Sequence, residues 1–139
     1  MKRSALAILT SLSVLAASAQ LGPNVTDWLF NTTGLMGRHY VQGNPTPIQD
    51  AVLANVQQVD YSTNWAYVHT HGIPAYITGP FLDGNPSLAT DQNAIFRIPR
   101  YPVQNTGTAT ATTGGNIGVF INGVALFDYR DGVAWNATT

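Results

Sequence analysis

The chain has 139 residues, of which only 9% are charged, and its formal net charge is −1. Because it contains no cysteine, it can form neither a disulfide framework nor a metal site built on thiolates. It also lacks a basic run, which argues against nucleic-acid binding, and no apolar stretch reaches the roughly 20 residues needed to span a bilayer.

Residues 1–19 have the three parts of a secretory signal peptide. Lys2 and Arg3 form the basic start, an apolar run follows, and a short Ala-Ser-Ala sequence supplies the small residues that a signal peptidase needs. We therefore expect cleavage before Gln20 and a mature protein that is secreted or periplasmic, without membrane insertion.

Residues 20–139 are enough for a single domain with a modest core. Cleavage removes the only lysine and one arginine, which leaves four arginines, seven aspartates and a net charge of −3. Frequent Asn, Thr, Gln and Gly with few charges suit an exported, β-rich protein. We predict an all-β fold, either a β-sandwich or a distorted barrel, with long loops.

The first half of this domain mixes irregular and extended segments. Glycines and prolines punctuate residues 21–47, which indicates an irregular entry. Residues 51–60 could form a helix by propensity, but the spacing of their valines favours a strand. A turn at residues 62–64 leads into a strand over residues 65–70, where Trp65, Tyr67 and His69 share one side.

The second half begins with a long loop over residues 79–93. Residues 95–98 then form a short strand, and the nearby prolines make it an edge strand or an exit from the sheet rather than a central strand. A segment of small residues, 106–115, leads from there into the terminal hairpin.

Residues 117–128 read as a β-hairpin around Asn122-Gly123, the strongest short hairpin signal. A two-residue turn there would place Ile121 opposite Val124, Phe120 opposite Ala125 and Val119 opposite Leu126. Both faces would then be apolar. Such a hairpin needs cover on both sides, from upstream segments, from a partner such as a second copy, or from a C-terminal segment beyond this chain.

Two histidines form the best candidate for a metal site. His69 and His71 lie two residues apart, so on a strand their imidazoles point to the same side and could chelate one ion, with His39 as a distant third ligand. Two ligands make an incomplete site. The competing interpretation is a pair of hydrogen-bonded or solvated histidines at a strand end.

The residues for catalysis are scarce, so we expect the protein not to be an enzyme. After residue 19 there is no Cys, Lys or Glu, and neither Ser62 nor Ser87 lies in a Gly-x-Ser-x-Gly turn. No cofactor is indicated. The three tryptophans and six tyrosines could stack on a glycan, although aromatic residues in a small β protein more often belong to the core.

Four blocks of sequence resemble the YHYH proteins, exported bacterial proteins named after a Tyr-His-Tyr-His motif. They are HGIPAYITGPF (71–81), GNP (84–86), FRIPRYPV (96–103) and GNIGVFINGVALFDYRDGVAWN (115–136). The resemblance implies the N-terminal part of such a domain, with the naming motif further toward the C-terminus than this chain extends. It implies a compartment and a fold, but no mechanism.

These observations predict an exported, YHYH-like binding or structural module that acts without catalysis. Two alternatives stay open: a metal-binding domain completed by downstream histidines, and a carbohydrate-binding module.

Overall fold

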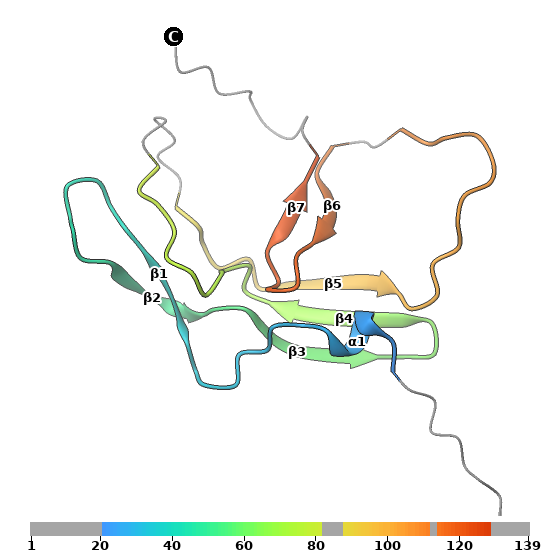
Figure 1. The fold of residues 1–139 in the computed structure, drawn as a ribbon, viewed down its shortest axis with the longest axis horizontal. Coiled ribbons are helices and arrows are strands. Elements are labelled where there is room, and N and C mark those ends of the chain that lie inside the picture. Colours follow the sequence, from blue (N-terminus) through green and yellow to red (C-terminus); the bar gives the residue numbers. More distant parts are fainter. Residues whose placement is uncertain (1–20, 82–87, 112–113, 129–139) are drawn as a thin grey trace, which may run out of the picture.

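A computed structural model describes residues 21–81, 88–111 and 114–128 (Figure 1). A short helix, α1 (Pro23–Thr26), precedes the strands. The strands are β1 (Met36–His39), β2 (Ile48–Leu53), β3 (Val56–Tyr61), β4 (Trp65–Thr70), β5 (Ala94–Pro99), β6 (Asn116–Val119) and β7 (Ala125–Phe127). The predicted all-β fold is confirmed. The described strands form three small antiparallel sheets and close no barrel, and no helix among these residues is long and apolar enough to cross a membrane.

The central sheet has the order β3-β4-β5 and is built around β4. Along β4, Ala66, Val68 and Thr70 are buried while the residues between them are partly exposed. This alternation confirms the predicted strand over residues 65–70, because successive side chains of a strand point to opposite faces. The predicted turn before it is also confirmed, since Ser62 N–H donates to the Trp65 carbonyl at 2.8 Å.

The single strand predicted over residues 51–60 is wrong. The segment is divided between β2 and β3, which belong to different sheets, and the chain turns between them at Asn55, whose φ is 62°. Asn tolerates this left-handed conformation better than most residues. The valine spacing therefore predicted extended backbone correctly but could not show the break.

The irregular entry predicted for residues 21–47 contains a strand, β1, that pairs with β2. Asn31 holds the approach to this pair. Its Nδ2 donates to the carbonyls of Leu35 (2.7 Å) and Ala54 (2.8 Å), while its Oδ1 accepts the Leu35 N–H. The bond to Ala54 joins segments 23 residues apart, so local sequence signals did not reveal it.

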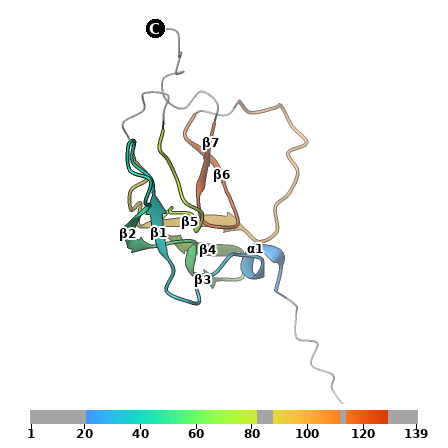
Figure 2. The same cartoon turned by 60° about the vertical axis from the view of Figure 1, so that its left-hand side comes forward.

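The hairpin β6–β7 meets the central sheet through its turn and then projects away from it, as the two views show (Figures 1 and 2). Gly123 is buried against Thr70 and Val56, and Leu29 N–H donates to the Ile121 carbonyl at 2.8 Å. The turn thus completes the core, in which the buried apolar side chains are Val25, Ala54, Val56, Ala66, Val68 and Ile73.

The hairpin is confirmed, but its predicted register is wrong. Phe120 N–H donates to the Val124 carbonyl and Gly123 N–H to the Phe120 carbonyl, both at 2.8 Å, which encloses a three-residue loop. Only Gly123 takes a positive φ, 81°, whereas a two-residue type I′ turn needs it at Asn122 as well. The extra loop residue shifts the ladder by one, so Val119 lies opposite Ala125.

Candidate functional site

Each histidine of the described chain lies against an aspartate. His39 Nδ1 is 2.7 Å from Asp50 Oδ1 and His71 Nδ1 is 2.7 Å from Asp91 Oδ1. His69 Nε2 is 3.0 Å from an Asp60 oxygen. The partners are 9 to 20 residues away in sequence, so only the pairing of strands and loops brings them together.

The structure pairs His69 and His71 with different carboxylates. His39 lies on β1, which belongs to another sheet. The described residues contain no group of three or more His, Cys, Asp or Glu that could hold a metal ion. The metal site at His69 and His71 stays a prediction, and its further ligands would have to come from outside the described residues.

The His71–Asp91 pair changes the acidity of its carboxyl group. The hydrogen bond from His71 lowers the pKa of Asp91 below its ordinary value of 3.8, and the Asn93 backbone N–H, which donates to Asp91 at 2.8 Å, lowers this pKa further. Both interactions favour the charged carboxylate.

We expect Asp91→Asn to reduce the loss of stability in acid. Because the pKa of Asp91 is lower in the folded state, its contribution is present above about pH 4 and is lost as the pH falls through the folded-state pKa. Urea unfolding of both proteins between about pH 6 and pH 2 should therefore give a shallower decline for the variant. Parallel declines would contradict this assignment.

The outer face of the central sheet carries polar and aromatic side chains. Trp65, Tyr67 and His69 alternate with the buried residues of β4, as the sequence predicted. The Arg97 guanidinium lies 4.4 Å from the centroid of the Trp65 ring, a cation–π distance. Asp60 pairs with Tyr67 in the ladder and is half exposed. This face therefore presents aromatic rings beside hydrogen-bonding groups.

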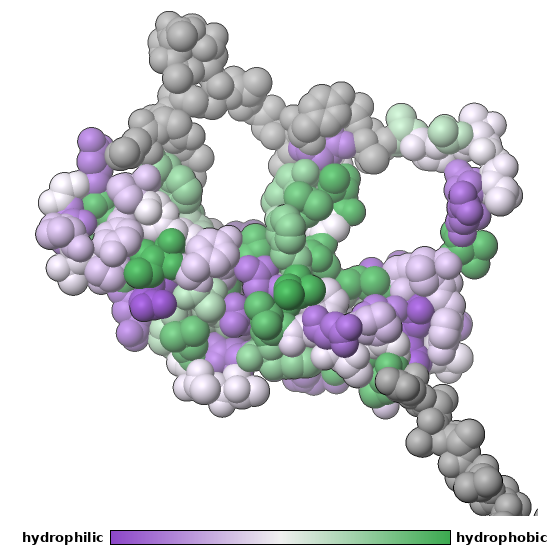
Figure 3. Space-filling model, in the orientation of Figure 1, coloured by the Kyte–Doolittle hydropathy of each residue, from purple (hydrophilic) through white to green (hydrophobic). Residues whose placement is uncertain are grey.

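A group of exposed apolar side chains surrounds the hairpin, where Figure 3 shows hydrophobic surface with open space on both sides. We call this group the hairpin patch, and its members are each between 41% and 61% exposed. They are Leu29, Tyr76, Ile117, Phe120, Ile121, Leu126 and Phe127. Upstream segments were one of the expected sources of cover for the hairpin. The described upstream segments leave these side chains about half exposed.

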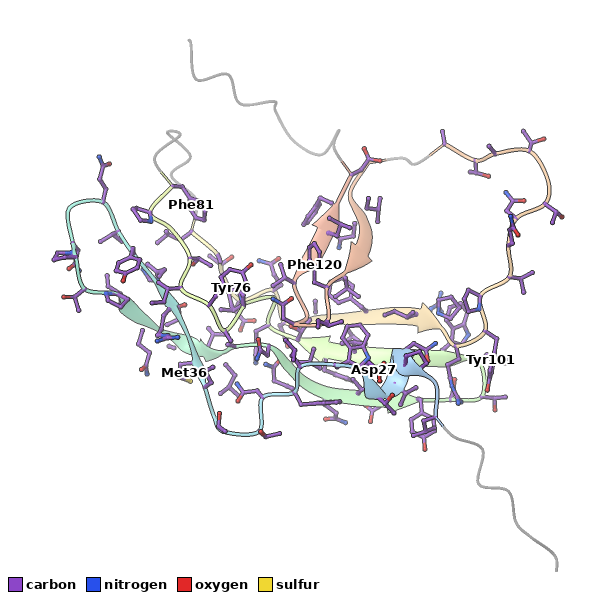
Figure 4. All side chains as sticks on the ribbon, viewed as in Figure 1. Asp27, Met36, Tyr76, Phe81, Tyr101 and Phe120 are labelled. Carbon is purple, nitrogen blue, oxygen red and sulfur yellow. The ribbon has the colours of Figure 1, made fainter. Side chains whose placement is uncertain are left out.

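Hollows flank the hairpin on both sides. On one side, Leu29, Tyr76 and Phe120 line a cavity of about 260 Å³, and Figure 4 places Tyr76 beside Phe120. On the other, hollows of about 310 and 440 Å³ lie between β5 and the hairpin and share Phe96 and Asn116. We call these two adjacent hollows the β5 groove. The hairpin is thus a ridge with an apolar depression on either side.

The described residues assemble no nucleophile with a base. Ser62 Oγ accepts the Trp65 N–H at 3.2 Å, a bond that stabilises the β3–β4 turn, and Ser87 lies outside the described residues. Asp91 orients the His71 ring, and no serine or cysteine among the described residues forms a hydrogen bond with that ring.

Comparison with known proteins gives one match. No curated protein and no solved structure matches the chain. A family model described as "YHYH protein" matches residues 95–139, which include the last two of the four sequence blocks and leave the first two outside. The resemblance to the YHYH protein family is thus confirmed over the segment that carries β5 and the β6–β7 hairpin.

Proposed function

We propose that this chain is an exported binding or structural module that acts without catalysis, and that it binds through the hairpin patch and the β5 groove. The observation that carries the proposal is the exposure of large apolar side chains on both faces of a projecting hairpin. Isolated two-stranded hairpins are marginally stable in water, and exposed apolar patches of this kind mark interaction sites. The signal-peptide pattern of residues 1–19 supports secretion or a periplasmic location.

A hydrophobic dye tests this binding surface. We expect the diluted, monomeric chain to enhance anilinonaphthalene sulfonate fluorescence, and Phe127→Ser to lower the enhancement at least about twofold, because Phe127 lines the β5 groove. Ile95→Ser is the matched control, since Ile95 is 60% exposed and does not line the hairpin hollows. A folded monomer that does not enhance the fluorescence of the dye would contradict the proposal.

A metal-binding domain completed by downstream histidines is the first alternative. It is favoured by the orientation of His71, because Asp91 engages Nδ1 and leaves Nε2 toward a ligand, as in many carboxylate–histidine–metal sites. Zinc should then raise the melting temperature of the chain and of His39→Ala, but not of His71→Ala.

A carbohydrate-binding module is the second alternative, and the outer face of the central sheet favours it. Tyr67 offers a ring for stacking, and Asp60 and Arg97 flank it on the neighbouring strands with groups that bond sugar hydroxyls. Trp65 is less available, because Arg97 already lies over its ring. Tryptophan fluorescence that stays unchanged across a glycan panel would remove this alternative.

A further inference from the structure

The hairpin patch exposes nearly as much surface as one partner buries in a standard protein interface. Its seven side chains, each about half exposed, leave roughly 700 Å² open to water if a fully exposed side chain of this size presents about 200 Å². A standard interface buries about 800 Å² on each partner, and a partner that covers both faces of the hairpin would bury the whole patch. The patch therefore has the area that one side of a stable interface needs.

The composition of the patch resembles the interior of a permanent interface. Residues 116–127 contain no charged side chain, although the domain as a whole has a net charge of −3 after cleavage. Interfaces between identical subunits are more apolar than transient ones, and charged residues are depleted from their centres. Two acidic copies can therefore approach through this patch without placing like charges against each other.

A ridge and a groove lie side by side in this surface. The hairpin is a ridge about one strand pair wide, and the β5 groove runs alongside it between β5 and β6. In a two-fold interface the same surface faces itself, so a ridge and a groove side by side can each receive the other from a second molecule. Such an arrangement covers both faces of each hairpin.

The unpaired strand edges also favour association with a second chain. Within the described residues β6 pairs only with β7, and β5 lies at the edge of its sheet, so these strands leave backbone N–H and C=O groups without strand partners. Uncovered edges of this kind pair readily with another chain.

We propose that a second copy of this chain covers the hairpin patch, with the hairpin of each copy lying in the β5 groove of the other about a two-fold axis. This inference rests on the proposed function, because it names the partner of the same surface. It commits to one occupant, and binding of a different protein or of further residues of the same polypeptide is an alternative outcome of the test.

Sedimentation velocity of the purified chain, at concentrations from about 1 to 100 μM, tests the proposal directly. We expect a dimer whose dissociation constant rises at least about 30-fold in Phe120→Glu, since replacing an aromatic residue at the centre of an interface has effects of this size. Ile48→Glu is the control, because it places the same charge at a comparably exposed position on β2, which belongs to another sheet, and it should leave the dimer intact. Circular dichroism confirms that both variants fold.

The absence of cysteine provides an independent measurement. In Ile121→Cys the new thiol is the only one in the chain, so a short bis-maleimide should link two copies through the hairpin, whereas Ile48→Cys on β2 should stay unlinked. A dimer that Phe120→Glu leaves unchanged would overturn the inference. A monomer that binds the dye at the patch would overturn the inference but leave the proposed function standing, and a folded monomer that does not bind it would overturn both.

Discussion

Replacing Gly123 by alanine is expected to destabilise the protein by about 3 kcal/mol, the largest effect of any single substitution considered. Gly123 has a φ of 81°, where an alanine is strained by about 1–2 kcal/mol. A Cβ there would also collide with the Thr70 side chain, 2.8 Å from its Cβ, and lie 3.2 Å from Val56. Such overpacking adds about 1–3 kcal/mol.

Gly43→Ala is the matched control for this substitution. Gly43 has nearly the same φ, 82°, but nothing lies within 4 Å of an added Cβ. We expect it to lower the free energy of unfolding by only about 1 kcal/mol. Urea unfolding of the three proteins measures the difference, and equal losses in the two variants would show that the hairpin turn does not pack on the sheet.

Val68→Ala is expected to lower the free energy of unfolding by about 2 kcal/mol. Val68 is one of the two largest side chains that are fully buried, and it lies in the middle of the central strand. The substitution removes two methyl groups and leaves a cavity, and only six apolar residues of the described ranges are buried, so little can move to fill it. This loss is a large fraction of the roughly 5–15 kcal/mol that stabilises a domain.

Val103→Ala makes the same chemical change at the surface. Val103 is 92% exposed, so we expect a change within about 0.5 kcal/mol. The two variants should be compared by their urea midpoints at unchanged slope. A similar midpoint for both would mean that the face of β4 that packs under the hairpin turn does not form the core.

At the hairpin, the sequence predicted the position of the turn but not the length of the loop. Asn122-Gly123 correctly located the turn, because few residues tolerate positive φ. The number of loop residues was decided by Asn122, which keeps a negative φ and accepts the Val124 N–H on its side-chain oxygen at 3.3 Å. The same dipeptide supports loops of two or three residues, so the register depended on how the turn packs against Thr70 and Val56.

The sequence likewise predicted only part of the candidate site. The sequence correctly placed Trp65, Tyr67 and His69 on one face of a strand, because the period of a strand is two residues. It did not pair His71 with Asp91 or His69 with Asp60, because these contacts join segments whose separation in sequence carries no periodic signal.

By itself, the sequence determined the all-β class, the two-sided apolar character of the hairpin and the resemblance to the YHYH family, since local alternation, composition and motif order are properties of the chain. The tertiary structure decided that the valine-rich segment is shared between two sheets and that the hairpin projects with both faces exposed. These features depend on which segments, distant in sequence, pack into the same small core. That competition is settled by packing and long-range hydrogen bonds, which short windows of sequence do not encode.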